Sequence, residues 1–255
     1  MSQTLLSLDR YLELLQQDSE ALAHVLERAE PALPVRTCPG WTLADLGYHV
    51  GEVHRFWHWI VREGIQEVTD ANSPNAARPA DDELARWLRE GLADLLPLLR
   101  SVDPQAPAWS WHAPQSDMAF IQRRLPHETS VHRWDAQDAA HAAGAAPPAP
   151  LARDLAVDGV AEFFLLGSRE RHEIETRMGL RATDTGDVWT ASVTNGEWQL
   201  VAGIADAPVV LSGTASALLL TLWRRMSPAG RGEVGVDVAG DPALARAFLA
   251  LADLD

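Results

Sequence analysis

The sequence is poor in cysteine and in positive charge. Cys38 is the single cysteine in 255 residues, so no disulfide can form within the chain, as is typical of cytoplasmic proteins. Lysine and arginine together number 21 against 36 aspartates and glutamates, which gives a formal net charge of −15. Nucleic acids and anionic membranes both bind basic surfaces, so this charge argues against either as the main partner. A small anionic substrate needs only a few local arginines and is not excluded.

The sequence also lacks the segments that direct a protein to a membrane or out of the cell. Its first residues do not follow the basic-then-apolar pattern of a signal peptide, and no apolar run approaches the length of a membrane span. The hydrophobic content of 47% and charged content of 22% are ordinary for a globular protein. We therefore expect a cytoplasmic localisation.

The first 142 residues predict helices, because apolar residues recur every three or four positions. The four segments with this pattern span residues 8–30, 43–60, 81–99 and about 126–142. Thr42 is placed to cap the second segment and Pro126 suits the first position of the fourth, whereas Pro97 should kink or end the third. Four helices joined by short to moderate loops indicate a bundle.

The region between the third and fourth helical segments carries a weaker pattern. Residues 103–116 contain three prolines together with Trp109 and Trp111, which predicts a loop packed by its own aromatic side chains. Residues 118–125 carry no pattern that favours one structure.

A linker and a different pattern follow. Residues 142–150 are rich in alanine, glycine and proline, and Asn195-Gly196 separates two β-rich runs, the sequence signal of a hairpin. The expected elements are a helix over 151–166, strands over 188–194, 197–201, 209–211 and 234–238, a helix over 214–225 and a helix from Asp241. The chain is thus predicted to form an N-terminal all-α four-helix bundle (residues 1–145) and a C-terminal α+β domain (residues 151–255).

The fourth helical segment contains the most informative motif, which begins at His127. Glu128 and His132 are four residues apart, so they share one face of a helix. A carboxylate and an imidazole in this arrangement are common ligands of zinc-type divalent metals. His127 lies five residues from His132 and falls on another face, so the run is not the zinc-protease motif with two histidines one turn apart.

A third candidate ligand lies on the second helical segment. His49 falls on the apolar stripe of that segment, between Leu46 and Val50, and bundles collect metal ligands from facing helices. His49, Glu128 and His132 would form a set of two histidines and one carboxylate that leaves a metal position open. The simpler interpretation treats His49 as a core imidazole. It treats Glu128 and His132 as an exposed pair of side chains on neighbouring helical turns.

Two segments resemble the signatures of a known family. Cys38-Pro39-Gly40-Trp41-Thr42-Leu43-Ala44-Asp45-Leu46, followed by His49, is similar to the opening signature of the mycothiol-dependent maleylpyruvate isomerase family. His127-Glu128-Thr129 through His132-Arg133-Trp134-Asp135-Ala136 resembles its second signature, and residues 209–225 resemble its small C-terminal domain. That family lies within the DinB-like superfamily of four-helix bundles, and the resemblance covers essentially the whole chain.

The resemblance implies a function. The family's metal ligands fall on His49, Glu128 and His132, with zinc as the expected divalent metal. Mycothiol, the low-molecular-weight thiol of actinobacteria, would be the thiol cosubstrate, and an electrophilic small molecule similar to maleylpyruvate the substrate. Metal coordination deprotonates a thiol, and the thiolate would add to the substrate, which describes an isomerase or a thiol S-transferase.

Other residues receive roles under the same resemblance. Arg224 and Arg225 are the candidate catalytic cations for the enolate that develops during thiol addition, and Trp134 and Arg224 are candidate cofactor-binding residues. Both arginines are equally expected as surface residues at the end of a helix. Arg124 and Arg133 are further candidates that we expect to pair with acidic neighbours.

Three further interpretations stay open from the sequence. Asp135 either orients the His132 imidazole or is an ordinary solvated carboxylate. Cys38 is expected to belong to a structural turn and not to act as a nucleophile. A non-catalytic protein that binds a metal or a small ligand on the same fold would have a closed site, with a fourth ligand such as His54 or His58, and a purely structural protein would hold no metal.

Overall fold

The computed structural model describes residues 5–69, 72–74, 76–112, 114–166, 175–204, 207–229 and 235–252. The chain forms two compact units, Ser7–Ala149 and Pro150–Asp255, the second grouped with Met1–Leu6. None of the helices in the described ranges is both long and apolar enough to cross a membrane.

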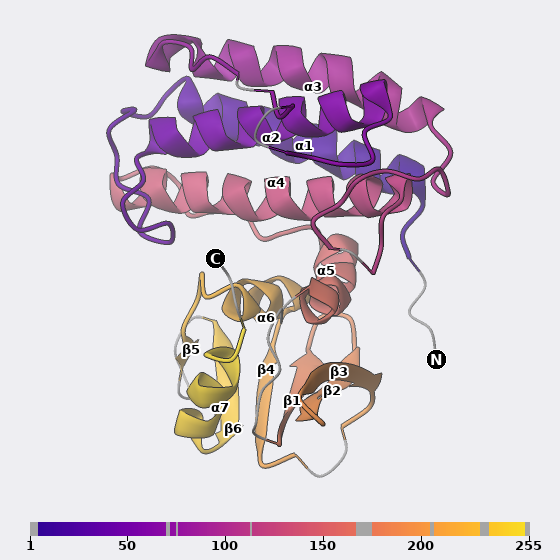
Figure 1. Cartoon of the computed structure of the whole chain (residues 1–255). Helices are drawn as coiled ribbons and strands as arrows, with labels where there is room; N and C mark the ends of the chain where they lie inside the picture. The colour runs from indigo at the N-terminus through magenta and orange to yellow at the C-terminus, as the bar shows by residue number, and fades with distance from the viewer. Residues whose placement is uncertain are drawn as a thin grey trace. The chain divides into compact units, whose positions relative to one another are not determined.

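The N-terminal unit is a bundle of four long helices (Figure 1). They are α1 (Leu8–Leu26), α2 (Leu43–Glu63), α3 (Leu84–Ser101) and α4 (Met118–Ala142), with a single 3₁₀ turn, η1 (Asp81–Glu83), before α3. Helix α1 packs against α3 and α4, and α2 packs against the same two helices. The side chains of Ser7, Thr42 and Asp117 cap α1, α2 and α4 by accepting bonds from backbone N–H groups of the first turn. The predicted four-helix bundle is confirmed.

Close packing between α2 and α3 depends on a glycine. A Cβ atom added to Gly51 would lie 2.2 Å from the ring of Trp87, so only glycine allows this approach. The Arg55 guanidinium covers the same ring at 3.7 Å from its centroid and donates to the carbonyl oxygen of Trp87. These contacts join α2 to α3, whose Ala85 and Leu88 also share a buried cluster with Leu46 and Val50 of α2.

Pro126 does not begin α4, as was predicted, and Pro97 does not end α3. Helix α4 begins at Met118, eight residues before Pro126, because the Asp117 carboxylate accepts from the Phe120 N–H and caps the helix there. Helix α3 likewise continues past Pro97 to Ser101. A proline inside a helix removes one backbone hydrogen bond, and the buried apolar faces of these long helices outweigh that loss.

The aromatic side chains of the 103–116 loop pack on helices as well as on one another. Trp109 contacts Phe56 and Trp57 of α2, at ring-centroid distances of 5.7 and 6.1 Å. Trp111 contacts Phe120 of α4 at 5.5 Å. The loop is therefore not packed by its own aromatics alone, and tertiary contacts that a local pattern does not contain determine its position.

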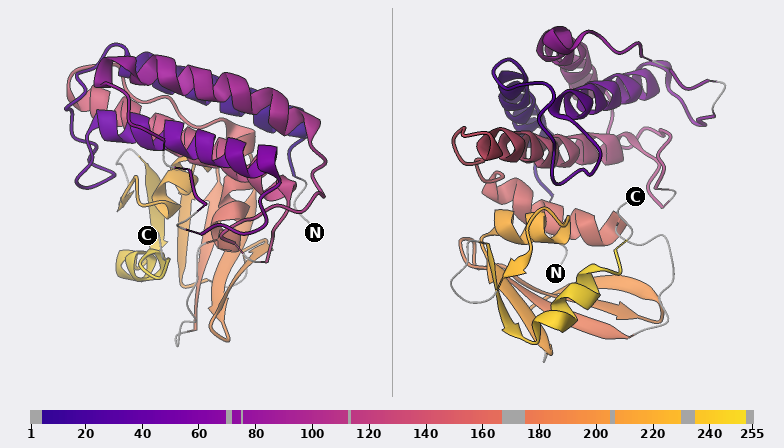
Figure 2. Two further views of the ribbon diagram at one scale, coloured as in Figure 1. Left: turned by 45° about the horizontal axis from the view of Figure 1, so that its top comes forward. Right: turned by 90° about the vertical axis from the view of Figure 1, so that its left-hand side faces the viewer.

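In its described residues the C-terminal unit is a mixed sheet with three helices, which confirms the predicted α+β class (Figure 2). Its described strands form one sheet in the order β3-β2-β1-β4-β6-β5. The strands are β1 (Thr176–Ala182), β2 (Val188–Thr194), β3 (Glu197–Ala202), β4 (Val209–Gly213), β5 (Pro228–Ala229) and β6 (Val236–Gly240), and the helices are α5 (Arg153–Leu166), α6 (Ala215–Leu222) and α7 (Pro242–Leu249). Strand β1, which the sequence analysis did not predict, pairs antiparallel with β2 and parallel with β4.

The local signals for turns and caps in this unit are confirmed. Asn195 and Gly196 both have positive φ (53° and 81°), as a two-residue hairpin turn between β2 and β3 requires. Thr214 caps α6 and Asp241 caps α7, with Pro242 in its first turn. Helix α6 ends at Leu222, three residues earlier than expected.

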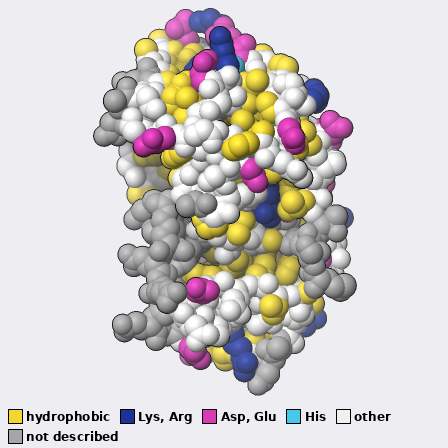
Figure 3. Space-filling model, turned by 45° about the vertical axis from the view of Figure 1, so that its right-hand side comes forward, with side chains coloured by type: hydrophobic (Ala, Val, Ile, Leu, Met, Phe, Trp, Pro, Cys, Tyr) yellow, Lys and Arg dark blue, Asp and Glu magenta, His cyan; other side chains and the backbone are white. Residues whose placement is uncertain are grey.

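The strongly negative charge is not gathered into one patch on the face drawn in Figure 3. Some acidic side chains gather beside arginines at the upper edge of the view, and the others lie separately among hydrophobic and other side chains. The negative charge does not form a single acidic patch on this face. A net charge of −15 therefore does not argue against a local cationic or metal site.

Candidate metal centre

Helix α4 presents Glu128 and His132 on one face, as their spacing predicts. The His132 Nε2 lies 3.1 Å from Glu128 Oε1. His132 is buried and Glu128 has a side chain that is 20% exposed. A carboxylate oxygen and an imidazole nitrogen thus meet at the surface of α4.

Helix α2 adds a third donor to the same point. The His49 Nε2 lies 3.3 Å from the same Oε1 of Glu128, and the two imidazole rings stand edge to face with centroids 5.1 Å apart. The ligand atoms of His49, Glu128 and His132 all lie within 4.8 Å of one another. The structure therefore brings the three residues predicted from the sequence into one group.

The donor set fits a divalent metal of the zinc type. Two nitrogen or oxygen ligands about 2.1 Å from a tetrahedral metal lie about 3.4 Å apart, close to the separations from Glu128 Oε1 to the two imidazoles. Two imidazoles and one carboxylate are ligands that zinc and its neighbours in the first transition row accept. The three residues can therefore hold a metal with small side-chain movements and leave at least one coordination position for another ligand.

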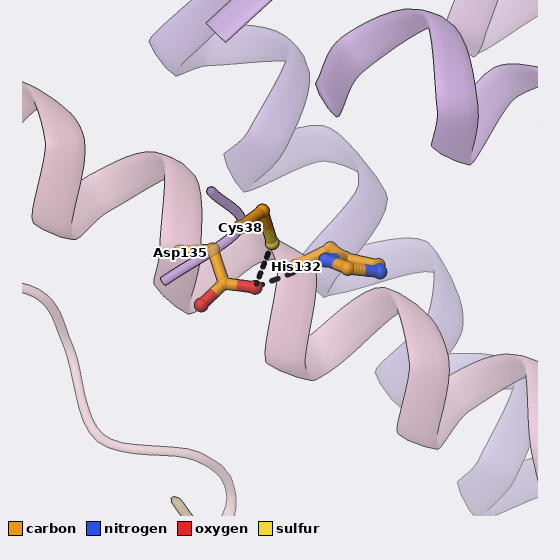
Figure 4. A group of neighbouring side chains, drawn as sticks. All are labelled: Cys38, His132 and Asp135. Atoms are coloured by element: carbon orange, nitrogen blue, oxygen red, sulfur yellow. Dashed lines mark hydrogen bonds and ion pairs between the residues drawn. The ribbon is translucent and has the colours of Figure 1, made fainter. Parts of the chain in front are cut away.

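The second nitrogen of His132 is held by a buried carboxylate (Figure 4). Its Nδ1 lies 3.0 Å from Asp135 Oδ2, and Asp135 is completely buried. An Nδ1–H that donates to a carboxylate leaves Nε2 as the metal-binding nitrogen and fixes the orientation of the ring. Asp135 therefore orients the imidazole, and the alternative of a solvated carboxylate is wrong.

Asp135 also receives donors from the turn that precedes α2. The Thr37 hydroxyl donates to Oδ1 at 2.7 Å, and the Cys38 thiol donates to Oδ2 at 3.7 Å. Next to them, Arg36 donates to both carboxylate oxygens of Asp138, each at 3.0 Å. Three consecutive residues of the turn thus bond to α4, two of them to the carboxylate that orients His132.

The position of Cys38 allows a second, overlapping group of donors. Cys38, His132 and Asp135 also offer three ligand atoms within 4.8 Å of one another. In this group the Cys38 thiol and the His132 Nδ1 both direct hydrogen bonds at the Asp135 carboxylate. These donors and their acceptor already satisfy one another, which favours the structural interpretation of Cys38.

The charges of Glu128 and His132 stabilise each other. Burial by itself would raise the pKa of Glu128, but the Arg124 guanidinium and the two imidazoles outweigh it and lower this pKa well below its usual value. Burial would lower the pKa of His132, but the Glu128 carboxylate and the bond to Asp135 raise it well above its usual value. Both shifts favour an ion pair between Glu128 and His132, whereas an imidazole that binds a metal must be neutral.

An aromatic side chain that the sequence analysis did not select borders the group. The ring of Trp41 lies 4.8 Å from the His49 ring and 6.3 Å from the His132 ring, measured between centroids. Its position three residues after Cys38 in the signature turn was the signal that could have identified it. Trp134, the predicted cofactor-binding tryptophan, is buried in α4, and its role stays a prediction.

The remaining histidines near the motif do not complete the group. His54 is fully buried, its Nε2 lies 3.1 Å from the Thr129 hydroxyl, and burial lowers its pKa to about 3. Neither His54 nor His58 belongs to a set of close metal-ligating atoms within the described part of the chain. His127 is buried against the Tyr11 ring, on another face of α4, as its spacing predicts.

Arg124 and Arg133 of α4 pair with acidic residues, as expected. Arg124 forms an ion pair with the Oε2 atom of Glu128, so it contacts a candidate ligand directly. Arg133 is buried and donates to Asp18 of α1 at 3.0 Å and to the Gln137 side chain at 2.9 Å. Arg124 is therefore a cation that the N-terminal unit itself supplies at the centre.

The predicted catalytic arginines of the C-terminal unit make backbone contacts. Arg224 has positive φ (59°) and donates to the carbonyl oxygens of Leu249 and Ala252, at 3.2 and 2.7 Å. Arg225 donates to the carbonyl oxygen of Trp223 at 2.9 Å. The bonds from Arg224 satisfy carbonyl groups at and after the end of α7. The catalytic role of Arg224 and Arg225 stays a prediction.

The chain is similar to known proteins in sequence and in fold. Residues 12–137 match the Mycothiol maleylpyruvate isomerase N-terminal domain family. No curated protein sequence matches the chain significantly.

Solved structures extend the similarity to the C-terminal unit. The crystal structure of the mycothiol-dependent maleylpyruvate isomerase superposes with a TM-score of 0.60 and 16% identity, over 92% of this chain and 93% of that chain. A histidine-to-alanine mutant of that enzyme superposes with a TM-score of 0.59 and 15% identity over the same shares. At this identity the superposition establishes the fold. Through residues 12–137, this chain belongs to the Mycothiol maleylpyruvate isomerase N-terminal domain family.

Proposed function

We propose that this protein is a metal-dependent enzyme that uses a low-molecular-weight thiol, such as mycothiol, on an electrophilic small molecule. The observation that carries the proposal is the group of three donor atoms from His49, Glu128 and His132, in a bundle of the maleylpyruvate isomerase type. The reaction would be either an isomerisation of a maleylpyruvate-like substrate or transfer of the thiol to the electrophile.

The donor set supports a catalytic site more than a storage site. Three protein ligands leave a coordination position for a thiol, whereas structural zinc sites are closed by four. A divalent metal held by these residues would lower the pKa of a thiol and so supply a thiolate at neutral pH. Zinc is the metal that we propose, because two imidazoles and a carboxylate suit it.

The chain's own residues would prepare the site before the thiol arrives. Asp135 holds the Nδ1 proton of His132, so that Nε2 points to the centre. Glu128 directs Oε1 at both imidazoles while its Oε2 contacts Arg124. Both imidazoles must be neutral to act as ligands, and the bond from Nδ1 of His132 to Asp135 leaves its Nε2 as the nitrogen that would bind the metal.

The electrophile would need a cation where negative charge develops on its carbonyl oxygen. We propose Arg224 or Arg225 for this role and Trp134 and Arg224 for contacts with the thiol cosubstrate. The two candidate reactions differ in the fate of the adduct between thiol and substrate. An isomerase would expel the thiolate again after bond rotation, and an S-transferase would release the adduct.

The first test is the metal content of the purified protein beside that of the His49→Ala variant. We expect close to one zinc per wild-type chain after incubation with zinc and dialysis, and little in the variant, because one of three ligands is lost. Arg86→Met is the matched control, since Arg86 forms an exposed ion pair on α3 away from the centre. Equal metal in wild type and His49→Ala would remove His49 from the site.

The second part of the test is turnover. The zinc-loaded wild type is assayed with mycothiol and maleylpyruvate, and separately with mycothiol and a model electrophile such as monobromobimane. Zinc binding without consumption of either substrate would leave a metal-binding protein without turnover. No zinc in any preparation would overturn the proposal.

A further inference from the structure

Arg124 forms an ion pair with the carboxylate oxygen of Glu128 that does not face the imidazoles. The two residues are four apart on α4, and the guanidinium pairs with Oε2. The other oxygen, Oε1, receives both Nε2 atoms, at 3.3 Å from His49 and 3.1 Å from His132. The two oxygens of one carboxylate thus have separate partners, one cationic and one facing the candidate metal position.

This division restricts how Glu128 can bind a metal. A carboxylate can coordinate through one oxygen or through both, and the second mode needs both oxygens turned to the metal. An ion pair between Oε2 and a guanidinium with a side chain only 11% exposed opposes that rotation. Glu128 therefore offers a single oxygen as long as Arg124 is present.

Arg124 also sets the net charge of the centre. With neutral imidazoles, the carboxylates of Glu128 and Asp135 and the guanidinium of Arg124 sum to −1. A divalent metal brings the group to +1, and an anionic ligand such as a thiolate then brings it to zero. Without Arg124 the same group would be neutral with metal and negative with the anion, which is unfavourable in a partly buried site.

Resting on the proposed function, we propose that Arg124 is a positioning residue that weakens metal affinity in favour of anion binding. It keeps Glu128 coordinated through one oxygen, which leaves a position open, and it keeps the loaded centre cationic. The direction in which metal affinity changes when Arg124 is removed distinguishes this role from a structural one. A residue that merely supports a ligand weakens metal binding when it is removed, whereas removal of Arg124 should strengthen it.

The experiment compares wild type, Arg124→Met, Arg124→Lys and the control Arg86→Met in the full chain. Arg86 forms the same i,i+4 pair with a glutamate, Glu90, at 3.0 Å on α3. Zinc dissociation constants are measured against a chromophoric chelator, and the visible spectrum of the Co²⁺-loaded protein reports the coordination number. Binding of 2-mercaptoethanol, an uncharged thiol, is followed by the sulfur-to-cobalt charge-transfer band.

We expect Arg124→Met to bind zinc at least about tenfold more tightly and the thiol about tenfold more weakly, because one positive charge beside the centre is lost. Its cobalt absorption should fall in intensity as Glu128 coordinates through both oxygens. Arg124→Lys keeps the charge and should retain affinities near wild type, and Arg86→Met should change neither. If Arg124→Met loses helical circular dichroism, Arg124→Gln, which removes the charge but keeps a polar side chain, replaces it.

The outcomes separate this inference from the proposed function. Weaker or unchanged zinc binding by a folded Arg124→Met, or an unaltered cobalt spectrum, would overturn the role of Arg124 while wild-type metal binding still supports the enzyme. A wild-type protein that binds neither zinc nor cobalt would overturn both.

Discussion

Helix α4 carries two buried charged groups that differ in what their atoms face. Around Arg133, the cation and the carboxylate of Asp18 face each other, and Gln137 accepts a further bond from the guanidinium. Around His132, two imidazole nitrogens and a carboxylate oxygen converge on one point. The first group is neutral by itself and ties α1 to α4. The second concentrates atoms that can all bind a cation, so convergence of ligand atoms, and not burial of charge alone, makes it a candidate metal site.

The largest effect that we expect is a loss of stability when Arg133 is replaced. Replacement of this 3% exposed side chain by methionine should lower the free energy of unfolding by about 3–5 kcal/mol, because the Asp18 carboxylate stays buried without its cation. Urea unfolding followed by circular dichroism measures this change. Zinc content of the folded variant should equal that of wild type. A loss of zinc in a folded Arg133→Met protein would show that the two groups are coupled.

A smaller effect is expected at Asp135, within the second group. Asp135→Asn replaces an acceptor of three side-chain donors by an amide, so the His132 ring loses its fixed orientation. Zinc affinity should fall roughly 10–100-fold with little loss of helix content. Competition with a chelator measures it.

Cys38→Ser is the matched control for Asp135→Asn, because a hydroxyl keeps a donor toward the same carboxylate. Its zinc affinity should be unchanged, and the Co²⁺-loaded wild type without added thiol should show no sulfur-to-cobalt charge-transfer band. A band that disappears in Cys38→Ser would instead assign the metal to Cys38, His132 and Asp135.

The smallest effect concerns a partly exposed charged group, Asp45, which caps α2 together with Thr42 and pairs with Arg78 at 2.6 Å. The bond from Arg78, followed by those from Thr42, lowers the pKa of Asp45 from 3.8 to about 2. A lowered pKa stabilises the fold above the unfolded-state value, and this stabilisation is lost as the pH falls through the folded value. Asp45→Asn should therefore cost about 1 kcal/mol at pH 7.

The difference between wild type and Asp45→Asn should shrink as the pH falls from 4 to 2. Urea midpoints at pH 7 and near pH 2.5 provide the measurement. A difference that stays constant with pH would show that the carboxylate charge contributes nothing there.

Periodic features of the sequence were predicted well, and the structure shows why. Glu128 and His132 share a face because helix geometry fixes positions four apart, and His49 joins them because its stripe on α2 faces α4. The Asn195-Gly196 turn and the Thr214 and Asp241 caps depend on single residues, so local chemistry was sufficient. Whether these three ligands bind metal stays a prediction.

The features that the sequence did not reveal depend on contacts between distant segments. The start of α4 at Met118 depends on the Asp117 cap in a region whose proline suggested a later start. Strand β1 alternates exposed Arg177 and Arg181 with buried Met178 and Leu180, but the central Gly179 weakens that pattern. The bonds from Thr37 and Cys38 to Asp135 join residues 98 and 97 positions apart, and no local pattern predicts them.

The long sequence separation within the centre also has a kinetic consequence. His49 and Glu128 are 79 residues apart, and Arg36 and Asp138 are 102 apart, so the donor atoms can meet only after a long stretch of chain has closed. Loop closure of this length precedes any gain from the contacts that it allows. The site should therefore form late in folding, and a partly synthesised or partly folded bundle should be unable to capture metal. The time at which the protein first binds metal would then report when the bundle has finished folding.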